Sequence, residues 1–165
     1  MLRSVQLPAG VSGLLLLHSM PGRREPLDRV WEEIRRQQVQ LLVSLAALSE
    51  IRGKSPTYAA ALEQKAVPCA VESFPIRDFG VPEEREDFWA LAVKVARQLR
   101  AGGRVLIHCG AGIGRTGTLA TCVLLALEQP RAQAESAVSA AGSHPETAEQ
   151  KELVSWCATR PPRVP

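Results

Sequence analysis

Along this chain, stretches with the hydrophobic pattern of a strand alternate with stretches that have the pattern of a helix. Three apolar runs, at 14–18, 39–45 and 67–74, have the length of buried strands. A fourth run, at 105–107, lies between glycine-containing turns, and its unbroken apolar character is typical of a strand buried on both faces of a parallel sheet. The pattern therefore predicts four strands.

The stretches between these strands have the patterns of helices. Between 27 and 38, apolar residues recur at helical spacing beneath a charged face. The stretch 83–101 follows a proline, begins with acidic residues and ends with arginines before two glycines, which are the usual signals of a helix start and end. The succession of strand, helix and strand from 14 to 45 predicts a β–α–β unit. Further helices are predicted at 56–65, 115–127, 130–141 and 146–159, and a loop is predicted at 49–53.

The length and composition of the chain suit one domain with a sizeable core. It has 165 residues, 45% of them hydrophobic, and no repeat or low-complexity run. We expect a single domain over residues 1–159. Residues 160–165 contain three prolines, which cannot continue a helix, so we expect a flexible C-terminal tail there.

Net charge and cysteine usage narrow the class of protein further. The formal charge of +3 permits attraction to anionic substrates. The sequence has no basic run interleaved with aromatic residues, so it does not indicate binding to nucleic acid. The four cysteines show no paired spacing of the kind that binds metal. Three of them, Cys69, Cys122 and Cys157, lie in apolar stretches and are predicted to be buried free thiols of a reducing compartment.

The N-terminal leucine run has some features of a signal peptide. It follows Arg3, but prolines and glycines interrupt the apolar region, and nothing there approaches the length that spans a membrane. We therefore expect an early core strand, no membrane association and a cytoplasmic location.

The most informative stretch follows the fourth apolar run. Cys109 is followed by glycines at 110, 112 and 114, which leave backbone N–H groups free to turn inward and form a concave anion site. The helix that begins near Arg115 points its N-terminus at this loop, and the guanidinium of Arg115 is suited to grip two phosphate oxygens. The same positive field favours the thiolate form of Cys109, a strong nucleophile.

The sequence His108-Cys109, five residues and Arg115-Thr116 resembles the signature loop of the cysteine-dependent protein tyrosine and dual-specificity phosphatase superfamily. A dinucleotide-binding loop is disfavoured for two reasons. The spacing of Gly110, Gly112 and Gly114 does not give the third glycine of that motif, and a cysteine stands at its first position. The alternative to a catalytic loop is a glycine-rich turn between strand and helix, with a buried cysteine that takes no part in a reaction. Within the superfamily, the chain is most similar to the branch of cyclin-dependent kinase-associated phosphatases and their bacterial relatives. The resemblance is carried by Met20-Pro21-Gly22, 41–50, Pro75-Ile76 with Asp78, the signature loop, and Gln150.

The resemblance implies an α/β fold, a role for each residue of the loop, and a monomer. The implied fold is a central, mostly parallel sheet of four to five strands with helices on both faces. Cys109 would be the nucleophile, His108 would orient the loop, and Thr116 would donate a hydrogen bond to the Cys109 sulfur. The phosphate would be held by Gly110, Ala111, Gly112, Ile113, Gly114 and Arg115.

Two further residues are implied outside the loop. Asp78 lies among prolines and a glycine at the end of a predicted strand, upstream of Cys109, where dual-specificity members carry their general acid. Low-molecular-weight tyrosine phosphatases have the reverse order and are disfavoured. Gln150 lies in a segment that resembles the one in which tyrosine phosphatases place a glutamine that positions the hydrolytic water. Taken alone, Asp78 would be a turn former and Gln150 an exposed helix residue.

The resulting hypothesis is a metal-independent phosphate monoester hydrolase without a cofactor, acting through a cysteinyl-phosphate intermediate. Its expected substrate is a phosphorylated protein, of the tyrosine or dual-specificity kind. A lipid, a small phosphate ester or an RNA end is the alternative, although Ala111 and Ile113 stand where phosphoinositide 3-phosphatases carry lysines. A non-catalytic phosphate-binding module is a further alternative, which the presence of Cys109, Arg115 and Asp78 disfavours.

Overall fold

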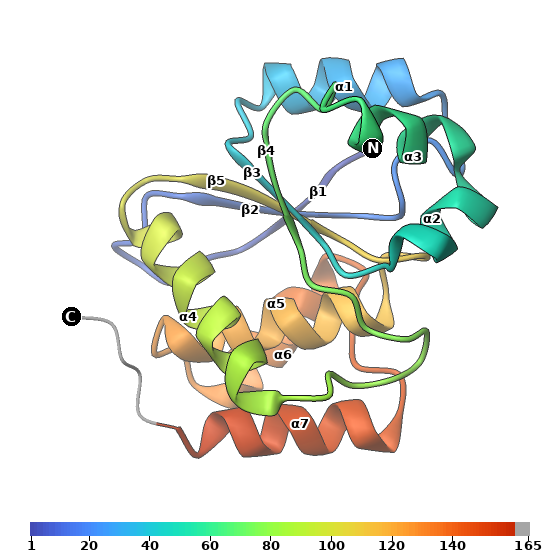
Figure 1. The fold of residues 1–165 in the computed structure, drawn as a ribbon. Coiled ribbons are helices and arrows are strands. Elements are labelled where there is room, and N and C mark those ends of the chain that lie inside the picture. Colours follow the sequence, from blue (N-terminus) through green and yellow to red (C-terminus); the bar gives the residue numbers. More distant parts are fainter. Residues whose placement is uncertain (161–165) are drawn as a thin grey trace.

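A five-stranded sheet forms the centre of residues 1–160, the part of the chain that this computed structural model describes (Figure 1). In sequence order the strands are β1 (Arg3–Val5), β2 (Leu14–His18), β3 (Leu41–Ser44), β4 (Ala70–Ser73) and β5 (Arg104–His108). Their spatial order is β1-β2-β5-β3-β4; β1 is antiparallel to β2, and all other neighbours are parallel. The predicted mostly parallel sheet is confirmed. The predicted tail lies outside the described residues except for Arg160.

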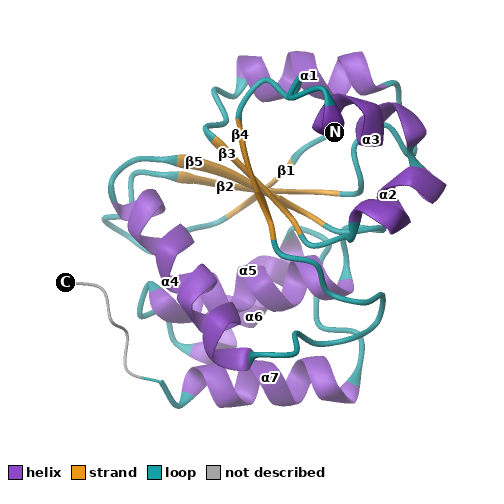
Figure 2. Ribbon diagram, in the orientation of Figure 1, coloured by secondary structure: helices purple, strands orange, loops and turns teal. Residues whose placement is uncertain are grey.

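Helices cover both faces of this sheet (Figure 2). One face carries α1 to α3 and the other carries α4 to α7 (Figure 1). Alternate residues of β5 serve the two faces, since Val105 and Ile107 belong to one hydrophobic cluster and Leu106 to the other. The helices are α1 (Leu27–Arg36), α2 (Leu48–Lys54), α3 (Pro56–Glu63), α4 (Arg85–Arg100), α5 (Gly114–Ala126), α6 (Arg131–Ala140) and α7 (Ala148–Ala158).

The central position of β5 fixes where the following loop lies. Its register aligns His108 with His18 of β2 and with Ser44 of β3, so the three parallel strands end together at one edge of the sheet. Ligand sites of open α/β sheets lie outside such carboxyl ends. Helix α5, which starts after the loop, is buried along nearly its whole length and packs against α4, α6 and α7. The loop is therefore held between two rigid elements.

Two sequence predictions were wrong in detail. The predicted loop at 49–53 is part of helix α2, whose Gly53 lies in open space and whose Ile51 is buried. The apolar run at 67–74 forms a strand only over 70–73, at the edge of the sheet, where Val71 is 38% exposed. A strand at the edge of a sheet has a neighbouring strand on one side only. The apolar residues of 67–74 are therefore less buried than their sequence pattern predicted. The short antiparallel strand β1 was not predicted at all.

No helix among residues 1–160 is both long and apolar enough to cross a membrane.

Candidate active site

Residues 109–115, called the phosphate loop below, turn tightly between β5 and α5. Cys109 is buried, and its Sγ accepts a hydrogen bond of 3.3 Å from the Gly112 N–H. Gly112 has a φ of +74°, and a Cβ there would run into the backbone carbonyl of His18 at the end of β2. Only glycine fits this close approach without strain. The sulfur is thus held within the turn of the loop by the Gly112 amide.

The Arg115 guanidinium lies at the mouth of this loop and is itself buried. It makes a bidentate pair with Glu50, at 2.8 Å and 2.9 Å, and Nη1 also donates to the Ile76 carbonyl at 2.8 Å. Nη2 donates to Oδ1 of Asp78 at 2.8 Å. The guanidinium is thereby fixed in one plane before any substrate binds, which removes the entropy cost of ordering a long side chain.

Glu50, on α2, is a site residue that the sequence analysis missed. Hydrogen bonds from Arg115, followed by one from Lys54, lower the pKa of the Glu50 carboxyl to about 2 in spite of its partial burial. Lys54 lies one turn later and bonds to Glu50 at 2.7 Å and to Oδ2 of Asp78 at 3.3 Å. The hydrogen bond to Glu50 is the largest cause of a raised Lys54 pKa. A Glu–Lys pair at this spacing is typical of an exposed helix face, so the sequence carried no signal of its role.

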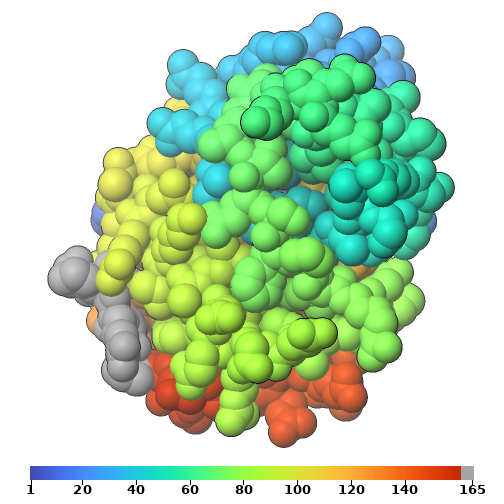
Figure 3. Space-filling view, in the orientation of Figure 1, coloured from blue at the N-terminus to red at the C-terminus, as the bar shows by residue number. Residues whose placement is uncertain are grey.

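Asp78 lies next to the phosphate loop, as its predicted role requires. The segment that carries it, 75–82, follows β4 and lies between α2 and α7 on the surface of the molecule (Figure 3). Its carboxylate is 47% exposed and bonds to Arg115 and Lys54. The structure therefore brings Asp78, Arg115 and the Cys109 loop together, and the general-acid role of Asp78 stays a prediction.

His108 is fully buried under the loop and joins two elements. Its Nδ1 lies 3.0 Å from the Cys109 carbonyl, which can only accept, so Nδ1 donates. Burial lowers the pKa of His108 to about 4, so the ring is neutral near pH 7 and Nε2 accepts from the Tyr58 hydroxyl at 2.9 Å. The ring thereby connects the phosphate loop to α3, and the role of His108 in orienting the loop stays a prediction. Tyr58, on α3, is buried and does not border the site.

The buried neutral His108 predicts a loss of stability in acid. The unfolded chain takes up a proton on this ring below about pH 6.5, whereas the folded chain does so only near pH 4. The free energy of unfolding should therefore fall as the pH falls from 6.5 to 4, by up to about 3 kcal/mol from this group. Denaturant unfolding of the native chain and of His108→Asn over this range tests it. His18, whose pKa burial also lowers, contributes in the same direction, so the variant should flatten the slope only in part. An unchanged slope would contradict the assignment.

Thr116 and Gln150 lie at the site in different ways. The Thr116 hydroxyl is buried and has no hydrogen-bond partner among the described residues, so its predicted bond to the Cys109 sulfur is not formed in this state. The Gln150 side chain caps α7 by accepting from the Glu146 and Thr147 N–H groups, and its amide donates to the Gly80 carbonyl at 3.2 Å. Gln150 thus connects α7 to the segment that carries Asp78, and its role in positioning water stays a prediction.

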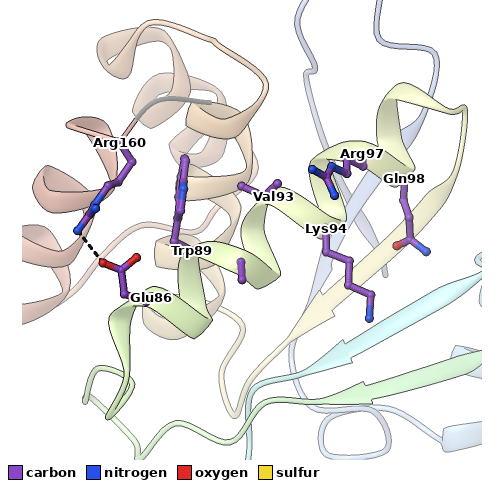
Figure 4. A pocket seen from close by; sticks show the side chains of 8 residues that line it. Glu86, Trp89, Val93, Lys94, Arg97, Gln98 and Arg160 are labelled. Carbon is purple, nitrogen blue, oxygen red and sulfur yellow. Dashed lines mark hydrogen bonds and ion pairs between the residues drawn. The ribbon is translucent and has the colours of Figure 1, made fainter. Parts of the chain in front are cut away.

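A separate hollow of about 500 Å³ lies along α4 (Figure 4). Arg160 borders it, donates to Glu86 at 2.8 Å and stacks over the Trp156 ring. None of its lining residues belongs to the phosphate loop or to the segment that carries Asp78. This hollow is therefore separate from the phosphate loop.

Comparison with known proteins agrees with this geometry. Residues 17–129, more than half of the chain and including the entire phosphate loop, match the family described as "Polymorphic toxin system, DSP-PTPase phosphatase". The chain belongs to this phosphatase family. A putative tyrosine phosphatase of Invertebrate iridescent virus 3 is 32% identical over 97 residues, which are 57% of this chain but only 38% of the viral protein. The chain thus matches less than half the length of that relative.

Solved structures extend the similarity over nearly the whole fold. A kinase-associated phosphatase with its catalytic-site cysteine replaced by serine superposes with a TM-score of 0.78 at 19% identity, covering 97% of both chains. Tk-PTP in its active form gives a TM-score of 0.71 at 25% identity, covering 91% of this chain and 95% of Tk-PTP. The fold of this phosphatase is therefore the one that these solved phosphatases share, and a member of the predicted kinase-associated branch is among them.

The contact between Glu50 and Arg115 leads to a prediction about this phosphatase. Glu50→Gln keeps the shape of the side chain but can no longer accept two charge-assisted bonds, so Arg115 should lose its fixed orientation. Small misplacements of a positioning group can cost roughly 100-fold, and we expect kcat/KM to fall by about that factor. Steady-state hydrolysis of p-nitrophenyl phosphate measures it. Glu63→Gln is the control, because Glu63 pairs with Arg52 on the surface. Equal kcat/KM in both variants would show that Glu50 has no part in catalysis.

Proposed function

We propose that this phosphatase hydrolyses phosphate monoesters through a cysteinyl-phosphate intermediate formed on Cys109. The observation that carries the proposal is the convergence of Cys109, Arg115 and Asp78, with Asp78 Oδ1 2.8 Å from the Arg115 guanidinium that closes the phosphate loop. A nucleophile, an anion cradle and a carboxyl group on its open side are the parts that two-step phosphoryl transfer requires.

The first step transfers the phosphoryl group to sulfur. The incoming phosphate replaces the Asp78 carboxylate on Arg115, and its oxygens bind the guanidinium and the amides of the loop. The Cys109 thiolate attacks phosphorus while the bond from phosphorus to the ester oxygen breaks. Once displaced from Arg115, the Asp78 carboxylate takes up a proton from solvent and gives it to the departing oxygen.

The second step releases phosphate. The Asp78 carboxylate takes a proton from a water molecule, whose oxygen attacks phosphorus, and the bond between phosphorus and sulfur breaks. The leaving thiolate is stabilised by the Gly112 N–H, which already bonds to the sulfur, and by the buried Thr116 hydroxyl, which has no hydrogen-bond partner within residues 1–160 in the resting state. Gln150, held between α7 and the Asp78 segment, is the residue we assign to positioning the water.

The substrate we favour is a phosphorylated protein. Among residues 1–160, Lys54 and Arg115 are the cations that bond to the Asp78 carboxylate, and Ala111 and Ile113 contribute no charge within the loop. This favours a single phosphate ester over a highly charged inositol lipid. A small phosphate ester or an RNA end is the second candidate. We further propose that the phosphatase acts in the cytoplasm, because its four cysteines are all free thiols, as is typical of a reducing compartment. We also propose that it acts as a monomer without nucleic-acid or membrane partners.

Hydrolysis of p-nitrophenyl phosphate in the presence of a chelator and a reductant tests the reaction. We expect turnover, and rapid acid quenching followed by mass spectrometry should find phosphate on the peptide that contains Cys109. Peptides carrying phosphotyrosine, phosphoserine or phosphothreonine then define the substrate. Freshly reduced protein that binds inorganic phosphate without turning over any of these esters would contradict the proposal and identify a phosphate-binding module.

A further inference from the structure

Arg3, on the edge strand β1, reaches the back of the phosphate loop. Its Nη2 donates to the Gly112 carbonyl at 2.7 Å, and its Nη1 donates to the carbonyls of Ala141 and Gly142 at 2.9 Å and 2.7 Å. The guanidinium therefore joins the N-terminal strand, the loop and the turn after α6. None of these contacts belongs to the reaction described above.

The Gly112 carbonyl receives a second donor from the opposite part of the chain. The buried Ser143 hydroxyl donates to it at 2.6 Å. A trans peptide points its C=O and the following N–H in opposite directions, and no cis peptide is found among the described residues. Because two donors hold the Gly112 carbonyl behind the loop, the Ile113 N–H is turned to the opposite side, toward the anion site.

The charges of Arg3 and Cys109 also interact. Burial lowers the pKa of Arg3, and the negative charge of Cys109 opposes that shift, so the two groups attract one another through the loop. Arg24, a nearby exposed arginine, lowers the Arg3 pKa by repulsion. A cation behind the loop favours the charged form of a thiol in front of it.

We propose that Arg3 is a positioning residue for the phosphate loop: it holds the Gly112 carbonyl so that the Ile113 amide faces the bound anion, and it supplies a positive charge behind Cys109. The role of Arg3 rests on the proposed function and extends it. It gives a residue that does not touch the substrate a part in phosphoryl-group binding and in the reactivity of the sulfur.

The test compares Arg3→Met and Arg3→Lys with the matched control Arg24→Met, which removes a nearby charge but no hydrogen bond to the loop. Two readouts do not depend on turnover: the pH midpoint of Cys109 alkylation by iodoacetamide, and protection of Cys109 from alkylation by inorganic phosphate. We expect Arg3→Met to raise the midpoint by about half a unit or more and to weaken phosphate protection roughly 10-fold. Arg3→Lys should recover most of the midpoint shift but not the phosphate affinity, because lysine restores the charge without the planar fork.

Ser143→Ala keeps the proposal testable if Arg3→Met does not fold. This variant removes one of the two donors to Gly112 and no charge, so it should weaken phosphate protection and leave the alkylation midpoint unchanged. A folded Arg3→Met with the native midpoint and native phosphate protection would overturn the inference, as would equal effects in Arg24→Met. Native protein that shows these pH and phosphate effects but hydrolyses no ester would refute the proposed function and leave the role of Arg3 standing.

Discussion

Replacing Cys109 by serine should abolish turnover, with kcat falling roughly 10⁵-fold or more, because removal of a nucleophile leaves only binding and positioning to accelerate the reaction. Serine keeps the size of the side chain, so the loop glycines, Arg115 and its partners should remain in place. Residues 110–115 carry no other thiol, hydroxyl or carboxylate that could replace Cys109 as the nucleophile. Quenched assays with p-nitrophenyl phosphate measure the loss.

The control for this variant is anion binding. Since the cradle consists of backbone amides and Arg115, Cys109→Ser should bind inorganic phosphate with an affinity close to that of the native chain, measured by calorimetry. Cys122→Ser is the matched variant, because Cys122 is a buried thiol within α5 that faces the core. Turnover that survives in Cys109→Ser and is lost in Cys122→Ser would refute the assignment of the nucleophile.

Replacing Asp78 by asparagine should have two opposite effects. It removes the proton donor, which lowers kcat by roughly 10² to 10⁴-fold. It also removes the negative charge that occupies Arg115 at 2.8 Å in the resting site, so the phosphate no longer competes with an internal carboxylate. We therefore expect inhibition by inorganic phosphate to become stronger as catalysis becomes slower.

The leaving group separates these two effects. An ester of a poor leaving group depends on protonation, whereas p-nitrophenolate departs readily without it. The loss of kcat in Asp78→Asn should therefore be larger for phenyl phosphate than for p-nitrophenyl phosphate. Asp87→Asn is the control, since Asp87 lies in the first turn of α4, outside the Asp78 segment. Equal losses with both esters would mean that Asp78 orients Arg115 and transfers no proton.

The sequence predicted the parts of the site that are local in the chain. An apolar strand, a glycine-rich loop and a buried helix follow from consecutive residues, and their geometry is set by backbone rules that act within a few positions. Asp78 was predicted through the family pattern and lies against Arg115. These features share one property, which is that each can be inferred without knowing what packs beside it.

Glu50 and Arg3 could not be found in this way. Each is a charged residue in an ordinary local context, and its role depends on a partner far along the chain: Glu50 and Arg115 are 65 positions apart, and Arg3 and Gly112 are 109 apart. Most of helix α2 was predicted as a loop, because Gly53 and the polar residues near it are typical of loops and Ile51 was the one apolar residue within 49–53. The exposure of β4 likewise follows from its position at the edge of the sheet. The hydrophobic pattern of a strand does not show which position in the sheet that strand takes.

The attachment of β1 to the phosphate loop has a consequence for folding. Arg3 contacts residues 112, 141 and 142, so the phosphate loop has all its contacts only when Arg3 has met residues more than 100 positions later in the chain. Contacts of such long sequence separation form slowly, because the closure of a large loop costs entropy before the contact stabilises it. During synthesis, the nucleophile emerges before the turn at 141–143 that anchors Arg3. A nascent or partly unfolded chain therefore lacks the contacts from Arg3 that hold the phosphate loop, and these contacts form only with the completed fold.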